Sequence, residues 1–258
     1  MTQDTLLADI FTFYQGKKAR YEYERILVAL LHRYALNFRT IYRSWPDFQA
    51  NSNFKFTIYT LLRPLISDAI LMMYLLEEFK WLVPTGAEDN REEWEVNETQ
   101  FLKRYEDISA TFFDRLDSYL KKKVKNSEMS PEEKMDFLSH HRNVFPEFYQ
   151  DNSETKLQKN RRITPAQMHD EIVYGKQFVK NLYDHYFRLS QFEHFTVVTE
   201  GLMSDPDKHS ELMYIVEITD CLLDSLNVNI STVRVHDQFR DKAAELINRF
   251  RSTQWNPK

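Results

Sequence analysis

Glycine is the residue that most constrains this chain, because it occurs only four times among 258 positions. Sheets and tight turns often use glycine, whereas a glycine in a helix interior is less favourable than alanine by about 1 kcal/mol. The shortage of glycine therefore predicts long helices joined by few loops. Apolar residues make up 42% of the chain, which is enough for a sizeable core.

Helix-start signals support the same prediction. Ser130-Pro131-Glu132-Glu133 has the pattern of a capping box with proline at the first helical position, and Thr164-Pro165 and Asp205-Pro206 follow similar logic. The acidic stretch 84–97 is typical of a surface loop, and Pro64 predicts a kink or break. Apolar periodicity predicts helices over 4–14, 18–44, 54–82, 97–124, 131–141, 165–200, 206–228 and 233–252.

We therefore predict an all-α protein in which residues 1–258 form a single domain of seven or eight helices, arranged as an irregular long-helix bundle. Segment 142–164 is the longest weakly periodic stretch. It is compatible with an ordered loop, a lid over the bundle or a seam between two helical layers.

Charge and cysteine content indicate the setting in which the chain works. A formal charge of −5 disfavours non-specific binding to nucleic acid, and Cys221 is the only cysteine. The N-terminus lacks the pattern of a signal peptide. The most apolar segment, 61–76, carries Arg63, Pro64 and Asp68 and is shorter than a membrane span. We expect a cytoplasmic protein with no membrane partner.

Common cofactor and metal motifs are absent from the sequence. No histidine has glutamate three residues before it, and no His-x-x-x-His pair occurs. Phosphate-binding loops, dinucleotide fingerprints and the hydrolase elbow are also missing. We predict no cofactor and no metal site.

Two polar strips beside apolar stripes are the candidate binding residues. In the first, Tyr186, Ser190 and Glu193 share one flank of a helix whose apolar stripe includes His185, a predicted core histidine, and His194 lies just beyond them. Such a strip is either a solvated face or the lining of a polar site.

The second strip consists of Arg63, Ser67, Tyr74 and Glu77. A buried Arg63 needs an acceptor, for which Glu193, Glu77 and Asp68 are candidates. A structural ion pair would explain this arginine equally well.

The segments Tyr186-Phe-Arg-Leu-Ser190-Gln-Phe-Glu-His194 and Arg63-Pro-Leu-Ile-Ser-Asp-Ala-Ile resemble an uncharacterised family of bacterial all-helical proteins. In that family an arginine-containing apolar helix precedes a helix with a Tyr-x-x-Leu-Ser-x-x-x-His-like stretch. The family pattern has glutamate four residues after the arginine, whereas this chain has Ser67 there and Asp68 beside it.

The broader neighbourhood of that family includes HEPN-like proteins, whose active members are ribonucleases that use an Arg-x(4–6)-His motif across a dimer. Three pairs here have this spacing: Arg25/His32, Arg162/His169 and Arg188/His194. None has a polar residue directly after the arginine, which departs from the usual motif.

The sequence does not identify the function. The leading hypothesis is a bacterial helical protein that acts by binding a partner or a small ligand through Arg63, Tyr186, Ser190 and Glu193. The partner itself is unknown, and a homodimer or a protein partner is compatible with the pattern. The alternative is a dimeric HEPN-like ribonuclease, in which His194 transfers a proton and Arg188 stabilises phosphate charge.

Overall fold

The all-α prediction is confirmed in the part of the chain that the structure, a computed structural model, describes. There 90% of the residues are helical and none forms a strand. The element order is α2 (Glu22–Ala50), α3 (Lys55–Leu76), the short 3-10 helix η2 (Glu77–Phe79), α4 (Arg91–Lys125), α5 (Pro131–Val144), α6 (Pro165–Glu171) and α7 (Lys176–Ser190). The described residues are 12, 21–51, 54–79, 91–144, 149, 163–190, 214, 215, 217, 218, 221, 222, 225 and 245.

The chain divides into two compact units, one formed by residues 1–98 with 165–258 and the other by residues 99–164. The second boundary lies at the end of segment 142–164, where the sequence allows a seam. The first boundary lies inside α4 and has no signal in the sequence. The prediction of one domain over 1–258 stays a prediction.

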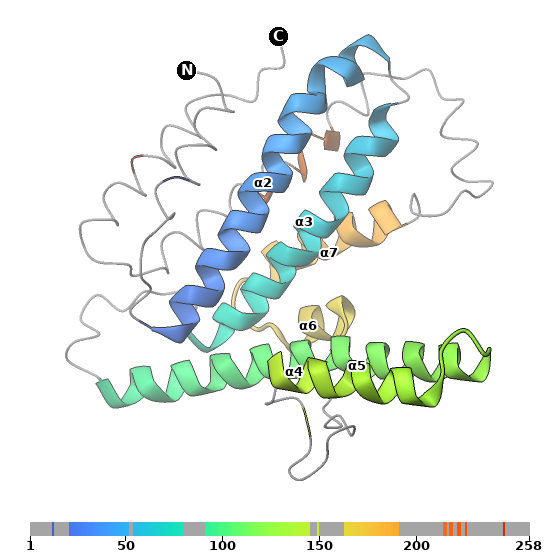
Figure 1. The fold of residues 1–258 in the computed structure, drawn as a ribbon. Helices are drawn as coiled ribbons and strands as arrows, with labels where there is room; N and C mark the ends of the chain where they lie inside the picture. The colour runs from blue at the N-terminus through green and yellow to red at the C-terminus, as the bar shows by residue number, and fades with distance from the viewer. Residues whose placement is uncertain are drawn as a thin grey trace. The chain divides into compact units, whose positions relative to one another are not determined.

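Helix α3 is the core helix of the first unit, and α2, α6 and α7 all contact it. Figure 1 shows α2 and α3 side by side and antiparallel. The face of α2 toward the core repeats at helical spacing and consists of Tyr23, Leu27, Leu31, Tyr34, Phe38, Ile41, Trp45 and Phe48. Helix α7 contributes Val179, Leu182, His185 and Leu189. Because these apolar stripes are buried, α2 and α7 pack with their apolar sides toward the core.

The sequence predicts a kink or a break at Pro64; helix α3 continues through this residue, so the break does not occur. Its neighbours Leu62, Leu65 and Ile66 are fully buried, and their burial favours an uninterrupted helix over a break at the proline. Segment 61–76 was predicted to be shorter than a membrane span. The whole helix α3, Lys55–Leu76, is nevertheless long and apolar enough to cross a membrane, judged by length and composition alone. It is mostly buried inside the first unit, as the core helix of a globular unit is.

Helix α2 extends six residues beyond its predicted end and includes Pro46. The extra turns bury Trp45 and Phe48, whose large apolar surface offsets the lost backbone hydrogen bond. Helix α4 begins six residues before its predicted start, so the predicted loop 84–97 is wrong for 91–97. No glycine or proline lies between 87 and 97 to stop a helix there.

The predicted helix 165–200 is interrupted within the described residues. Helix α6 ends at Glu171 and α7 begins at Lys176. Gly175 between them has φ of 63°, which glycine adopts without steric cost. The described positions of the predicted helix 206–228 are helical. Helices 4–14 and 233–252 lie outside the described residues apart from Thr12 and Glu245, and both of these are helical.

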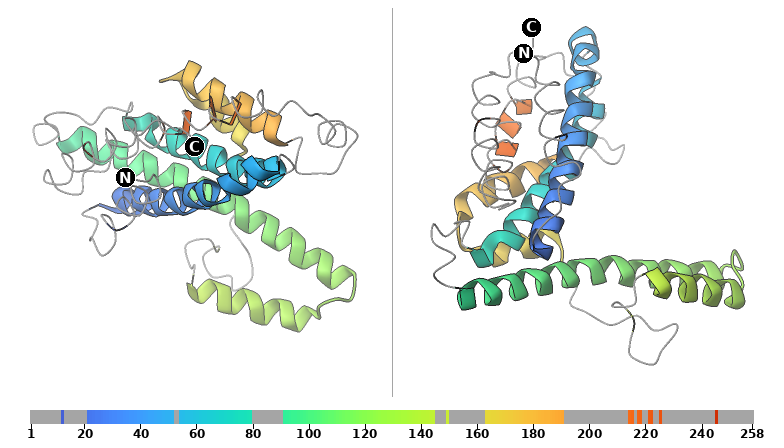
Figure 2. Two further views of the ribbon diagram at one scale, coloured as in Figure 1. Left: turned by 90° about the horizontal axis from the view of Figure 1, so that it is seen from above. Right: turned by 60° about the vertical axis from the view of Figure 1, so that its left-hand side comes forward.

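The second unit is built on the hairpin of α4 and α5, which Figure 2 shows as two antiparallel helices. Leu120, Leu138 and Tyr149 form its apolar cluster. Lys134 of α5 pairs with Asp117 of α4 at 3.2 Å. Burial opposes ionisation of Asp117, but hydrogen bonds from Lys121 and Lys134 outweigh it and lower the pKa of that carboxyl. The hairpin is thus held by an apolar cluster and a cross-helix ion pair.

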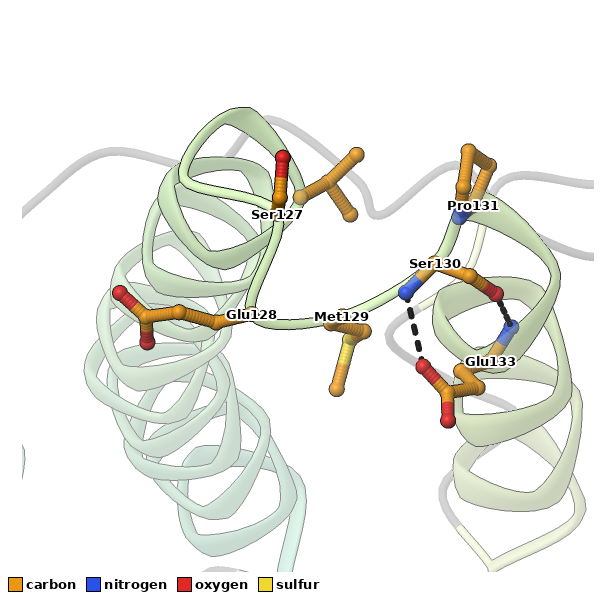
Figure 3. Close-up of a pocket in the computed structure, with 7 residues that line it drawn as sticks. Ser127, Glu128, Met129, Ser130, Pro131 and Glu133 are labelled. Atoms are coloured by element: carbon orange, nitrogen blue, oxygen red, sulfur yellow. Dashed lines mark hydrogen bonds between the residues drawn. The ribbon is translucent and has the colours of Figure 1, made fainter.

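The turn between α4 and α5 ends one helix and begins the next. The amide of Glu128 donates to the Lys123 carbonyl at 3.0 Å and that of Ser127 to the Val124 carbonyl at 3.1 Å. This is the Schellman pattern, with Ser127 in the left-handed position at φ 59°. The predicted capping box is confirmed (Figure 3), because the Glu133 amide donates to Ser130 Oγ and the Ser130 amide to Glu133 Oε2. The same turn borders an open hollow of about 400 Å³.

Replacing Ser127 with glycine should stabilise the protein, because glycine adopts the left-handed conformation without the Cβ clash. We expect the free energy of unfolding to rise by about 1 kcal/mol. Urea denaturation followed by circular dichroism measures it. Ser127→Ala is the matched control and should give no gain, because alanine keeps the Cβ; equal stabilities of the two variants would contradict the assignment.

Candidate functional site

The polar flank predicted on α3 is the surface that receives α6 and α7. Arg63 Nη2 donates to the Tyr186 hydroxyl of α7 at 3.1 Å. About three turns further along α3, the Tyr74 hydroxyl donates to Glu171 Oε2 of α6 at 3.2 Å. Glu77 binds the chain between α6 and α7. Three of the four residues predicted to share this flank therefore hold the α6–α7 segment against α3.

Glu77 compensates for the break between the two helices. Its Oε1 accepts hydrogen bonds from the amides of Val173 and Tyr174, at 2.8 and 2.9 Å. The chain has left α6 here, so intrahelical carbonyls no longer serve these amides. A carboxylate makes stronger hydrogen bonds to amides than a neutral acceptor does. Because Glu77 is buried, these bonds fix where α7 begins.

Arg63 is half-buried, and its guanidinium lies 4.9 Å from the centre of the Tyr186 ring. We predicted a carboxylate partner for this arginine. Of the three candidates, Asp68 pairs with Arg33 and Glu77 binds backbone amides, while Glu193 lies outside the described residues. A hydrogen bond to the phenol of Tyr186 and a cation–π interaction with its ring help to orient the guanidinium.

Tyr186 belongs to a column of stacked side chains, which we call the aromatic column: Arg63, Tyr186, Tyr183 and His169. The Tyr186 and Tyr183 rings are 6.2 Å apart at 23°, and the Tyr183 and His169 rings are 4.8 Å apart at 20°. Three helices contribute to it, namely α3, α7 and α6. All four residues are partly exposed. The column therefore combines flat aromatic faces with polar side chains at a partly exposed position of the first unit.

Sequence reasoning missed Tyr183, and it considered His169 only as the partner of Arg162 in a ribonuclease-like pair. Tyr183 lies three residues before Tyr186, a spacing that places both on one side of a helix and could have revealed it. His169 had no such signal, because it belongs to another helix and reaches the column only through the break at 172–175. Within the described residues its buried Nε2 makes no hydrogen bond, while Nδ1 lies 3.0 Å from Asp170 Oδ1.

The remaining residues of the predicted strip are described only in part. Ser190 is half-buried, and its hydroxyl donates to the Phe187 carbonyl at 2.6 Å. Glu193 and His194 lie outside the described residues. The structure thus joins Arg63 and Tyr186, and it places Ser190 one turn further along α7.

His185 and Arg188 of α7 both contact Tyr214. His185 is 8% exposed, and its ring lies 5.5 Å from that of Tyr214. Burial lowers the pKa of His185, although the carboxylate of Glu217 opposes the effect. The Arg188 guanidinium lies 3.9 Å from the Tyr214 ring centre. Burial raises the pKa of Tyr214 to about 12. His185 accordingly packs as a core histidine, and Arg188 lies on an aromatic face.

Of the other two arginine–histidine pairs, the structure describes both residues only for Arg25 and His32. Arg25 forms an exposed ion pair with Glu22, and Arg162 lies outside the described residues. No three His, Cys, Asp or Glu side chains in the described part come together in a way that could hold a metal ion.

No protein-family model, curated protein or solved structure matches the chain. The relation to bacterial all-helical and HEPN-like proteins therefore stays a prediction.

The contact between Arg63 and Tyr186 should be measurable as a coupling energy. A double-mutant cycle of Arg63→Met and Tyr186→Leu should give a coupling of about 1–2 kcal/mol, because it removes both the hydrogen bond and the cation–π contact. Repeating the cycle with Tyr186→Phe keeps the ring, so this second coupling energy reports the hydrogen bond alone, and the difference between the two cycles gives the cation–π part. Chemical denaturation of the variants measures both values. Additive effects in both cycles would show that the contact does not hold the column together.

Proposed function

We propose that the protein binds a small ligand or a segment of a partner along the aromatic column, in the cytoplasm of a bacterium. The observation that carries the proposal is Arg63, a half-buried residue whose guanidinium is oriented by the hydroxyl and the ring of Tyr186. A binding group that is already oriented loses less conformational entropy when its ligand arrives. The site has the character of a binding surface.

The chemistry of the column favours a ligand that carries an anionic group. Arginine donates up to five hydrogen bonds and matches carboxylate or phosphate geometry. Tyr183 and Tyr186 add flat faces on which a planar group can stack. Ser190, one turn beyond Tyr186 on α7, extends the proposed surface, and Glu193, also predicted to bind, lies outside the described residues. A small acidic molecule with a flat part fits this combination best.

Ligand binding is tested by thermal unfolding in the presence of inorganic phosphate, nucleotides and aromatic carboxylates. We expect at least one of them to stabilise the protein by about 2.7 kcal/mol at a hundred times its Kd, which corresponds to roughly 5–10 °C in the melting temperature. The shift should disappear in Arg63→Met. The matched control is Arg115→Met, which removes an exposed arginine of the second unit and should keep the shift.

Two results would contradict this proposal. One is a shift of equal size in the wild type and in Arg63→Met, which would place the ligand elsewhere. The other is cleavage of a mixed RNA pool that is lost in His194→Ala while the melting temperature is unchanged, as the ribonuclease alternative requires. We expect no cleavage, because Arg188 lies over the ring of Tyr214.

A further inference from the structure

The second unit exposes large apolar side chains on both helices of its hairpin. Tyr119 of α4 is 54% exposed, and Phe137 and Val144 of α5 are 41% and 56% exposed. The residues that directly follow the two rings, Leu120 and Leu138, are buried in the cluster between the helices. Single exposed apolar side chains are common on protein surfaces, so what matters here is where these residues lie on the hairpin.

Helical geometry places Tyr119 and Phe137 on the same side of the hairpin. Successive residues of a helix are about 100° apart, and each ring comes one residue before a leucine of the shared cluster. Because α4 and α5 run antiparallel (Figure 2), the same backward step leads to the same side in both helices. Val144 follows Phe137 by two turns and lies on that side as well. We call this side, which carries Tyr119, Phe137 and Val144, the hairpin face.

Two further aromatic side chains connect the hairpin face to the buried cluster. The ring of His141 lies 5.9 Å from that of Phe137 at 20°, in a stacked arrangement. His141 Nδ1 lies 2.8 Å from the Tyr149 hydroxyl, and Tyr149 itself packs with Leu120 and Leu138. Aromatic surface therefore extends from the buried leucines to the exposed ring of Phe137.

A charged residue accompanies each ring on the side toward the α4–α5 turn. Lys123 follows Tyr119 by four residues, and its Nζ lies 5.2 Å from the centre of that ring. Glu133 precedes Phe137 by four residues and thus shares its flank of α5. The last turn of α4 is basic and the first turn of α5 is acidic. Because α4 ends at 125 and α5 begins at 131, the lysine and the glutamate lie at equal distances from the turn, and so do the two rings.

We propose that the hairpin face binds a second copy of this chain, so that two hairpins form a four-helix bundle with both turns at the same end. A twofold axis along such a bundle places α4 of one chain beside α5 of the other at equal height. Tyr119 then meets the partner subunit's Phe137, and Lys123 meets the partner subunit's Glu133. Each copy carries both halves of these pairs, which makes the face complementary to itself in shape and charge. Hairpins with turns at opposite ends would separate the lysine from the glutamate.

Sedimentation equilibrium of the full chain over a range of concentrations tests the dimer. We expect a mass that approaches twice the 31.1 kDa of one chain. Phe137→Lys places a charge in the interface and should raise the dimer Kd about tenfold or more. The matched control is Phe187→Lys, which changes an exposed phenylalanine of the first unit and should leave the Kd as it is. A wild type that stays monomeric, or equal Kd values for the two variants, would overturn the proposal.

A charge reversal tests which groups meet across the interface, and it does so without changing an apolar side chain. Lys123→Glu would set an acid against the partner subunit's Glu133 and should weaken the dimer about tenfold. Lys125→Glu makes the same change on the opposite side of α4 and should have no such effect. Equal weakening by both variants would show that the charges of the hairpin face do not select the partner.

Crosslinking between single-cysteine chains tests the direction of the two hairpins. Chains with Tyr119→Cys and chains with Phe137→Cys, both in a Cys221→Ser background, are mixed and treated with a short bis-maleimide. We expect a two-chain product that is far more abundant in the mixture than with either variant alone. A dimer that gives no excess product in the mixture would contradict the arrangement with both turns at the same end.

Discussion

The first unit depends on polar side chains carried by α3 and by η2, which follows it directly. Arg63, Asp68 and Tyr74 of α3 and Glu77 of η2 lie among apolar neighbours, and each contacts a polar group of another element. A buried polar group without a partner costs about 1–3 kcal/mol, so a misplaced neighbouring helix would be penalised at several positions together. Apolar packing alone would tolerate shifts of register along α3. These contacts specify which helix packs on which flank of α3 and at which position along its axis.

The same contacts build the candidate site. Glu77 fixes the chain between α6 and α7, and Arg63 holds Tyr186 further along α7. Tyr183 and His169 then stack on the side that faces α6. The column therefore results from the way in which α6 and α7 are held against α3. The opposite flank of α3 carries Asp68, which pairs with Arg33 of α2. One helix thus positions the proposed ligand surface and also holds α2.

Sequence reasoning found the helical class and the shared flank of Arg63, Tyr74 and Glu77, because both depend on spacing along one helix. It did not find the partners of these residues, which come from helices whose docking no local pattern encodes. The break at 172–175 was missed although Gly175 marks it, because apolar periodicity continues on both sides. The break expected at Pro64 does not occur, because tertiary burial outweighs one missing hydrogen bond. Tyr183 was within reach of helical spacing, whereas His169 required knowledge of the break.

Helix α3 is the element that organises the first unit. Native-state hydrogen exchange tests this claim most directly. Amides buried deepest in a cooperative unit open only with its global unfolding. We therefore expect the amides of 65–76 to exchange more slowly than those of α2, α6 and α7, at rates that approach global unfolding. If α2 and α7 stayed protected while these α3 amides exchanged quickly, the unit would be organised by other contacts and the account would be wrong.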